Sequence, residues 1–175
     1  MNEEEKDKLL NNILDDLHKA TLAIPVLDGY EIQDDSMGAI FIAKSKDNSV
    51  IQYLEDGKLE EGEEFEERLK KVLTETEKAI TDTGFRATEL KFIENFDTKL
   101  FKYKLYLQDN VVGNVLIRQV NAYFIEPESR YFYEIILAAP PVNKEDENDN
   151  ITNNILSRLK VILNNVKYNE ENPLK

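Results

Sequence analysis

Between residues 85 and 139 the sequence alternates apolar and polar side chains with the two-residue period of β-strands. The alternation is clearest over residues 101–107, where aromatic and leucine side chains alternate with two lysines and a tyrosine. We expect four strands here, over 85–95, 99–108, 111–125 and 130–139. The polar segments 108–110 and 127–129 are too short for anything but hairpin turns. The pattern therefore predicts antiparallel pairing in this half of the chain.

In the last two of these strands, both alternating phases carry apolar side chains, which is typical of a sheet covered on both faces. Helical spacing of apolar residues predicts the covering helices over 3–22, 61–82 and 151–166, the last with Asp149 or Asn150 as its N-cap. Three short strands are expected between the first two helices, over 30–34, 38–44 and 49–54. Gly84 is expected to cap the second helix at its C-terminus.

The predicted fold class is α+β: an α/β/α sandwich with a central antiparallel sheet of about six to seven strands and three main helices. The helix with Phe65 should cover one face and the helix with Ile155 the other. The first helix is expected to pack on the same face as the helix with Ile155, through Ile13 and Leu17. We expect one domain over residues 1–175, divided into an N-terminal helix (1–24), a core (29–166) and a frayed tail (169–175).

Composition excludes several kinds of chemistry. The chain has no cysteine, which rules out disulfides, zinc–thiolate sites and a thiol nucleophile, and His18 is its one histidine. The net charge of −13 is unsuited to nucleic acid, and no apolar run is long enough to span a membrane. No glycine-rich phosphate loop or nucleophile elbow occurs. We therefore expect a cytoplasmic protein without cofactor or metal that is not an enzyme.

The order of these elements resembles the PsbP-like fold, to which bacterial DcrB-type proteins belong. The resemblance covers roughly residues 29–166 and includes the apolar strand over 131–138 and the C-terminal helix over 151–166. It implies an α/β/α sandwich and a group of small binding or assembly factors without a common catalytic site. It transfers no functional residue to this chain.

The first candidate binding residues are Glu63, Glu64, Glu66 and Glu67, which lie in the acidic run 60–67. Such a run attracts a cationic partner or a hard cation. It is equally typical of an acidic first helical turn, with i,i+4 pairs from Glu64 to Arg68, Glu66 to Lys70 and Glu67 to Lys71.

The second group of candidates is Tyr103, Tyr123 and Arg118, because tyrosine and arginine anchor many protein interfaces. The alternative for these tyrosines is packing within the sheet.

Two further patterns are weaker. His18 has Asp15 nearby on the same helix, as a general base would need, but no nucleophile is close in sequence, so we interpret it as a surface or boundary residue. Asp146, Asn148 and Asn150 match the first, third and fifth positions of a calcium loop. The match fails at the sixth position, where the loop requires glycine and this chain has Ile151. A loop that caps a helix is the simpler interpretation.

These observations favour a non-enzymatic protein-binding or assembly module of unknown partner and oligomeric state. One alternative is an acidic, immunity-type inhibitor of a basic toxin, since opposite charge speeds association. A second is a carboxylate-dependent hydrolase, for which no pair of carboxylates is selected by spacing.

Overall fold

The computed structural model describes residues 1–18, 22–35, 38–82 and 86–169. The helices are α1 (Glu3–His18), α2 (Phe65–Asp82), α3 (Asp149–Asn164) and the short 3-10 helix η1 (Lys144–Asp146). The strands are β1 (Leu22–Ala23), β2 (Tyr30–Ile32), β3 (Phe41–Ser45), β4 (Val50–Lys58), β5 (Arg86–Ala87), β6 (Lys91–Asp97), β7 (Lys102–Val112), β8 (Val115–Ile125), β9 (Tyr131–Ala138), β10 (Val142–Asn143) and β11 (Lys167–Tyr168).

One antiparallel sheet forms the centre of the molecule, in the order β2-β3-β4-β9-β8-β7-β5. Strand β6 also pairs with β7, and β10 with β8. Strands β1 and β11 form a separate two-stranded sheet. In the described residues the central sheet has nine strands, of which β5 and β10 contain only two residues each. The predicted α+β fold with a central antiparallel sheet is confirmed.

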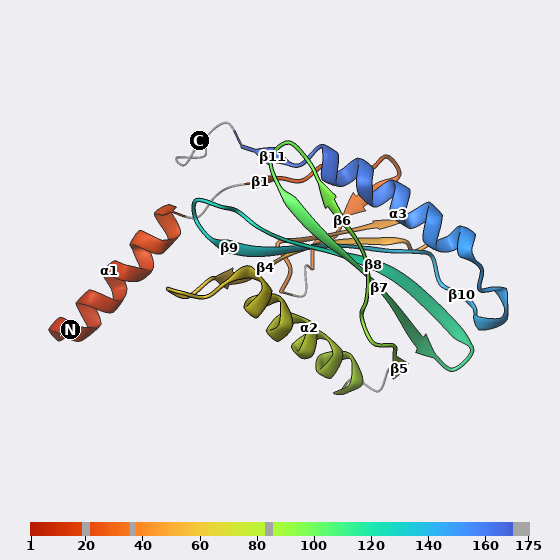
Figure 1. The fold of residues 1–175 in the computed structure, drawn as a ribbon, viewed down its shortest axis with the longest axis horizontal. Coiled ribbons are helices and arrows are strands. Elements are labelled where there is room, and N and C mark those ends of the chain that lie inside the picture. Colours follow the sequence, from red (N-terminus) through yellow and green to blue (C-terminus); the bar gives the residue numbers. More distant parts are fainter. Residues whose placement is uncertain (19–21, 36–37, 83–85, 170–175) are drawn as a thin grey trace.

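The two later helices cover opposite faces of the sheet (Figure 1). Helix α3 buries Ile155, Leu159, Ile162 and Leu163 against one face. Helix α2 packs Leu69 and Val72 against Tyr123 and Phe132 on the other face. Both phases of β9 are consequently buried, as its sequence predicts.

Three local predictions are wrong. The hairpin between β7 and β8 does not turn at 108–110 but at Gly113 and Asn114, because β7 stays paired with β8 as far as Val112 opposite Val115. Gly113 has a φ of 59°, a left-handed conformation that glycine adopts at little cost and that a two-residue turn needs. The sequence offers this Gly-Asn pair as a signal of its own.

The strand predicted over 85–95 is divided into β5 and β6. Thr88, between them, accepts a hydrogen bond at its hydroxyl from the Asp109 amide, at 2.9 Å. The N-cap of α3 is Asn148, one residue before the earlier of the two predicted caps. Its extended backbone lets its side chain accept a hydrogen bond from the Asn150 amide, at 2.9 Å.

Helix α1 leads away from the sheet (Figure 1), and the side chains of residues 1–11 are all exposed. Leu9 is 50% exposed and Leu10 is 55% exposed. The predicted contacts of Ile13 and Leu17 with the α3 face, the cap at Gly84 and the tail beyond Asn169 lie outside the described residues or side chains.

Candidate functional site

The acidic run before α2 folds around Glu63, which is 6% exposed. Its carboxylate accepts hydrogen bonds from the Glu60 amide at 3.0 Å and from Arg68 Nη2 at 2.7 Å, and it pairs with Lys71 Nζ at 3.1 Å. The hydrogen bond from the Glu60 backbone, followed by that from Arg68, lowers the pKa of Glu63 to about 2. Glu63 is therefore an internal carboxylate, and the prediction that it presents charge to a partner is wrong.

Two arginines connect this loop to β4 and to the β8–β9 turn. Arg68 donates to the carbonyl oxygens of Asp56 at 2.9 Å and Lys58 at 3.0 Å, at the end of β4. Arg130, in the β8–β9 turn, donates to the Glu63 carbonyl. The start of α2 is thereby fixed to β4 and to the β8–β9 turn. Arg68 and Lys71 bind Glu63 rather than the partners predicted from i,i+4 spacing.

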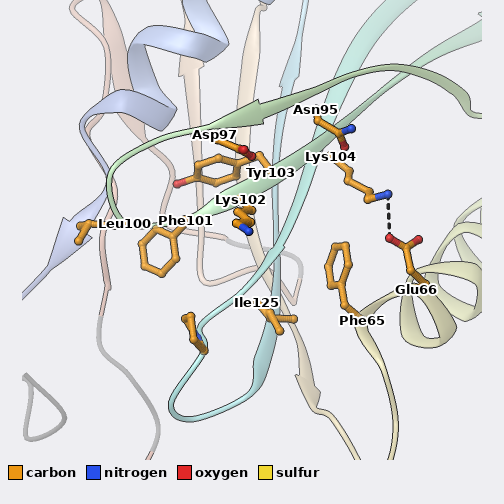
Figure 2. Close-up of a pocket in the computed structure, with 11 residues that line it drawn as sticks. Phe65, Glu66, Asn95, Asp97, Leu100, Phe101, Lys102, Tyr103, Lys104 and Ile125 are labelled. Atoms are coloured by element: carbon orange, nitrogen blue, oxygen red, sulfur yellow. Dashed lines mark ion pairs between the residues drawn. The ribbon is translucent and has the colours of Figure 1, made fainter.

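A groove of about 580 Å³ lies beside this fixed helix start (Figure 2). Three elements border it: the first turn of α2, the β6–β7 hairpin and the β8–β9 turn. Its lining residues are Phe65, Glu66, Asn95, Asp97, Leu100, Phe101, Lys102, Tyr103, Lys104, Ile125 and Pro127. The groove exists because α2 starts at Phe65 and leaves this end of its sheet face uncovered.

The groove combines apolar walls with a charged rim. Phe65 is held in place by stacking on Phe132, with the ring centroids 5.4 Å apart, and Leu100 is 43% exposed. Lys104 pairs with Glu66 at 2.7 Å, so its charge is partly neutralised (Figure 2). Lys102 is exposed, and no acidic side chain within the described residues lies in ion-pair distance of it. Its amine is the cation that the groove offers to a ligand.

Exposed Phe92 extends the apolar surface along β6. Its side chain is 51% exposed and packs edge-on against Tyr106, with a centroid separation of 5.6 Å. The Lys104 amine lies 5.9 Å from the centre of the Phe92 ring. This end of the sheet therefore presents an aromatic, a lysine and an apolar groove side by side.

The two candidate tyrosines belong to the core. Tyr103 is 1% exposed and packs on Phe124, with ring centroids 4.8 Å apart. Tyr123 is fully buried, and its hydroxyl accepts a hydrogen bond from Asn121 Nδ2 at 3.0 Å. Burial raises the pKa of both hydroxyls. Packing within the sheet is what the structure shows for both, and neither ring is accessible as an interface anchor.

Arg118 is also internal, at 5% exposure. Its guanidinium binds Asp109 through two hydrogen bonds of 2.7 and 2.9 Å, pairs with Glu147 and donates to Thr152 Oγ1 at 3.1 Å. Hydrogen bonding to Asp109 raises its pKa. Arg118 therefore ties β7 and β8 to the start of α3, which makes it a structural residue rather than an interface anchor.

A carboxyl pair that was not predicted from the sequence lies beneath α2. Asp56 on β4 and Glu134 on β9 approach each other on neighbouring strands, and Glu134 is 5% exposed. Burial, followed by the hydrogen bond with Asp56, raises the pKa of Glu134 to about 9. The signal in the sequence is an acid within the otherwise apolar strand β9. Neither carboxyl lines the groove.

The calcium-like positions serve the helix, since Asn148 caps α3. Within the described residues, no group of three or more histidine, cysteine, aspartate or glutamate side chains could hold a metal ion. The side chain of His18 lies outside those described. No helix in the described part of the chain is long and apolar enough to cross a membrane.

Comparisons with known proteins inform the fold alone. No protein-family model matches the chain, and no curated protein matches its sequence. Among solved structures, the chain is similar to LpqN of Mycobacterium tuberculosis, a protein described as involved in cell envelope biogenesis. The TM-score is 0.52 and the sequence identity 14%, and the match covers 86% of this chain and 84% of LpqN. At this identity the likeness shows a shared fold and no shared function.

Proposed function

We propose that this protein is a non-enzymatic binding module that docks a protein partner in the groove between α2 and the β6–β7 hairpin. The observation that carries the proposal is the groove itself. Its volume of about 580 Å³ falls within the range of about 300–1,000 Å³ usual for binding pockets. Apolar walls beneath a charged rim are the arrangement that interfaces use for an anchoring side chain.

The chemistry of the groove defines the partner segment. An apolar side chain fits against Phe65, Leu100 and Ile125, and an acidic side chain beside it pairs with Lys102. Phe92 offers additional aromatic area outside the groove. The proposed partner is therefore a protein segment in which apolar and acidic residues are adjacent.

A second candidate function, an acidic inhibitor of a basic toxin, would use part of the acidic run 60–67. Glu64, just before α2, and Glu67, in its first turn, are exposed, although Glu63 is internal and Glu66 pairs with Lys104. An inhibitor of a basic toxin would use these two glutamates, and its association would slow as salt rises. The PsbP-like grouping and the cytoplasmic location stay predictions.

Affinity capture with matched variants tests the groove. Leu100→Asp places a charge at the groove, and Val161→Asp makes the same kind of change on the exposed side of α3, where Val161 is 53% exposed. We expect wild type and Val161→Asp to recover the same partner and Leu100→Asp to lose it. Equal recovery by all three proteins would contradict the proposal. Loss with Glu64→Lys and Glu67→Lys, but not with Leu100→Asp, would favour the acidic inhibitor.

A further inference from the structure

We propose that α1 folds back onto the groove of its own chain and covers it until a partner displaces it. The inference rests on the proposed function, because it treats the groove as a binding surface. It assigns a role to α1, whose described side chains, over residues 3–11, are all exposed. Three observations support it: the exposed Leu9 and Leu10 of α1, the position of Leu22 near the groove, and the lysines of the β6–β7 hairpin opposite an acidic helix.

The described apolar side chains of α1, Leu9 and Leu10, belong to neither hydrophobic cluster. Leu9 and Leu10 are about half exposed, and helical spacing continues their stripe through Ile13 and Leu17. A short isolated helix is marginal in water, since helices of this length owe their stability to packing of an apolar face. Helix α1, with 16 residues, therefore requires a partner surface to be stable.

The chain after α1 is anchored at the end of the groove. Leu22 pairs with Tyr168 across the β1–β11 bridge, and the Tyr168 ring lies 5.7 Å from the ring of Phe101, a lining residue. The Tyr168 hydroxyl donates to Glu126, next to Pro127 at the groove. The four peptide steps from His18 to Leu22 reach about 14 Å at most. The end of α1 therefore stays near the groove.

This tether favours closure within one chain over exchange between two chains. A short covalent link gives the attached segment an effective concentration on the order of millimolar. Protein concentrations in most experiments are far lower. The groove of the same chain is therefore the first surface that α1 encounters.

Helix α1 is acidic, whereas the β6–β7 hairpin at the groove has more lysines than acids over residues 97–104, although the groove lining itself is neutral. Helix α1 carries six acidic residues against two lysines. The groove and its hairpin present Lys99, Lys102 and Lys104 against Glu66 and Asp97, and Lys104 is already paired with Glu66. The adjacent leucines and acids of α1 also match the apolar and acidic partner segment that the groove accepts. Helix α1 is thus an internal competitor for the same surface.

The absence of cysteine makes the test direct, because two introduced cysteines are the only thiols. In the full chain, Asn11→Cys on α1 is combined with Asn95→Cys at the groove and treated with a short bis-maleimide. A matched control combines Asn11→Cys with Asn154→Cys on α3, which is also exposed. We expect crosslinking within one chain for the first pair, with a yield about tenfold above the control. Adding Leu10→Asp should lower that yield about tenfold, the factor that burial of one leucine supports.

Similar yields for the two pairs, no crosslink with the groove, or a crosslink only at the mass of a dimer would overturn the inference. The result is separate from the proposed function. If the groove pair fails to crosslink while Leu100→Asp still loses the partner, the groove remains the binding surface and α1 does not cover it.

Discussion

The two faces of the sheet are built differently, although they share the same strands. Among the side chains that the structure describes, the α3 face holds a cluster of 21 buried apolar residues and the α2 face a cluster of five. Both faces also bury polar groups: Arg118 is paired with Asp109 on the α3 face, and Asp56 and Glu134 form a carboxyl pair beneath α2. The α3 face therefore holds the larger described part of the core, and the α2 face carries the groove at which we propose recognition.

The largest expected effect compares one leucine from each face. Leu159 is fully buried beneath α3, and Leu69 is 2% exposed beneath α2. We expect Leu159→Ala to lower the free energy of unfolding by about 3–5 kcal/mol and Leu69→Ala by about 2–3 kcal/mol, because a cavity collapses less in the larger cluster. Urea unfolding of both variants measures the difference. A larger loss for Leu69→Ala would reverse the assignment of the two faces.

The second prediction concerns the polar group of the α3 face. Arg118→Met keeps much of the side-chain volume but leaves Asp109 and Glu147 without their cation. Because Asp109 and Glu147 are partly solvated, we expect a loss of about 2–3 kcal/mol, below the 3–5 kcal/mol typical when a fully buried pair is broken. Chemical denaturation gives the value. A loss under about 0.5 kcal/mol, as for a surface residue, would show that Arg118 does not hold α3 to the sheet.

The third prediction concerns the pH dependence of stability, to which Glu134 and Glu63 contribute in opposite directions. The folded pKa of Glu134 is raised to about 9, so its contribution to stability is complete below its ordinary pKa of 4.5 and is lost as pH rises toward 9. Asp56 shifts in the same direction through burial. Glu63, with its pKa lowered to about 2, acts oppositely: its contribution is present above pH 4.5 and is lost as pH falls toward 2.

We therefore expect stability to fall between pH 5 and pH 8, by at most about 1.4 kcal/mol per pH unit from one group. Glu134→Gln should remove most of this slope while preserving the shape of the side chain. Urea titrations of wild type and Glu134→Gln at both pH values provide the measurement. An unchanged slope in the variant would mean that Glu134 is ionised in the folded protein.

The smallest expected effect lies at the groove. Lys102→Glu and Leu100→Asp alter exposed side chains, so we expect each to change the free energy of unfolding by less than about 0.5 kcal/mol. Thermal unfolding of both variants tests this. A loss of several kcal/mol would show that the groove is part of the structural core.

Local patterns predicted the fold better than the site. Apolar periodicity was sufficient to predict the antiparallel sheet and its two covering helices. Alternate residues of a strand point to opposite faces, so the positions of the apolar residues show which faces are buried. The chemical roles were harder to predict. Glu63 belongs to an exposed-looking acidic run, yet contacts from Arg68 and Lys71 make it internal. Such contacts depend on how the loop before α2 folds, which spacing along the chain does not specify.

The groove itself had no motif in the sequence. Its lining residues come from α2, the β6–β7 hairpin and the β8–β9 turn, which are brought together only by the topology of the sheet. Lys102 and Leu100 are individually ordinary residues of a hairpin. By contrast, Glu134 could have been found as the acid in an apolar strand, and Gly113 as the first residue of a Gly-Asn turn.

The division of roles between the two faces is tested most directly by amide hydrogen exchange of the full chain, alone and with the partner that wild type captures. We expect the partner to slow exchange in the β6–β7 hairpin over 98–104 and in the first turn of α2 from Phe65, with no change in α3. Protection confined to α3 or to the β2–β3 edge would contradict the assignment of the α2 face as the recognition surface.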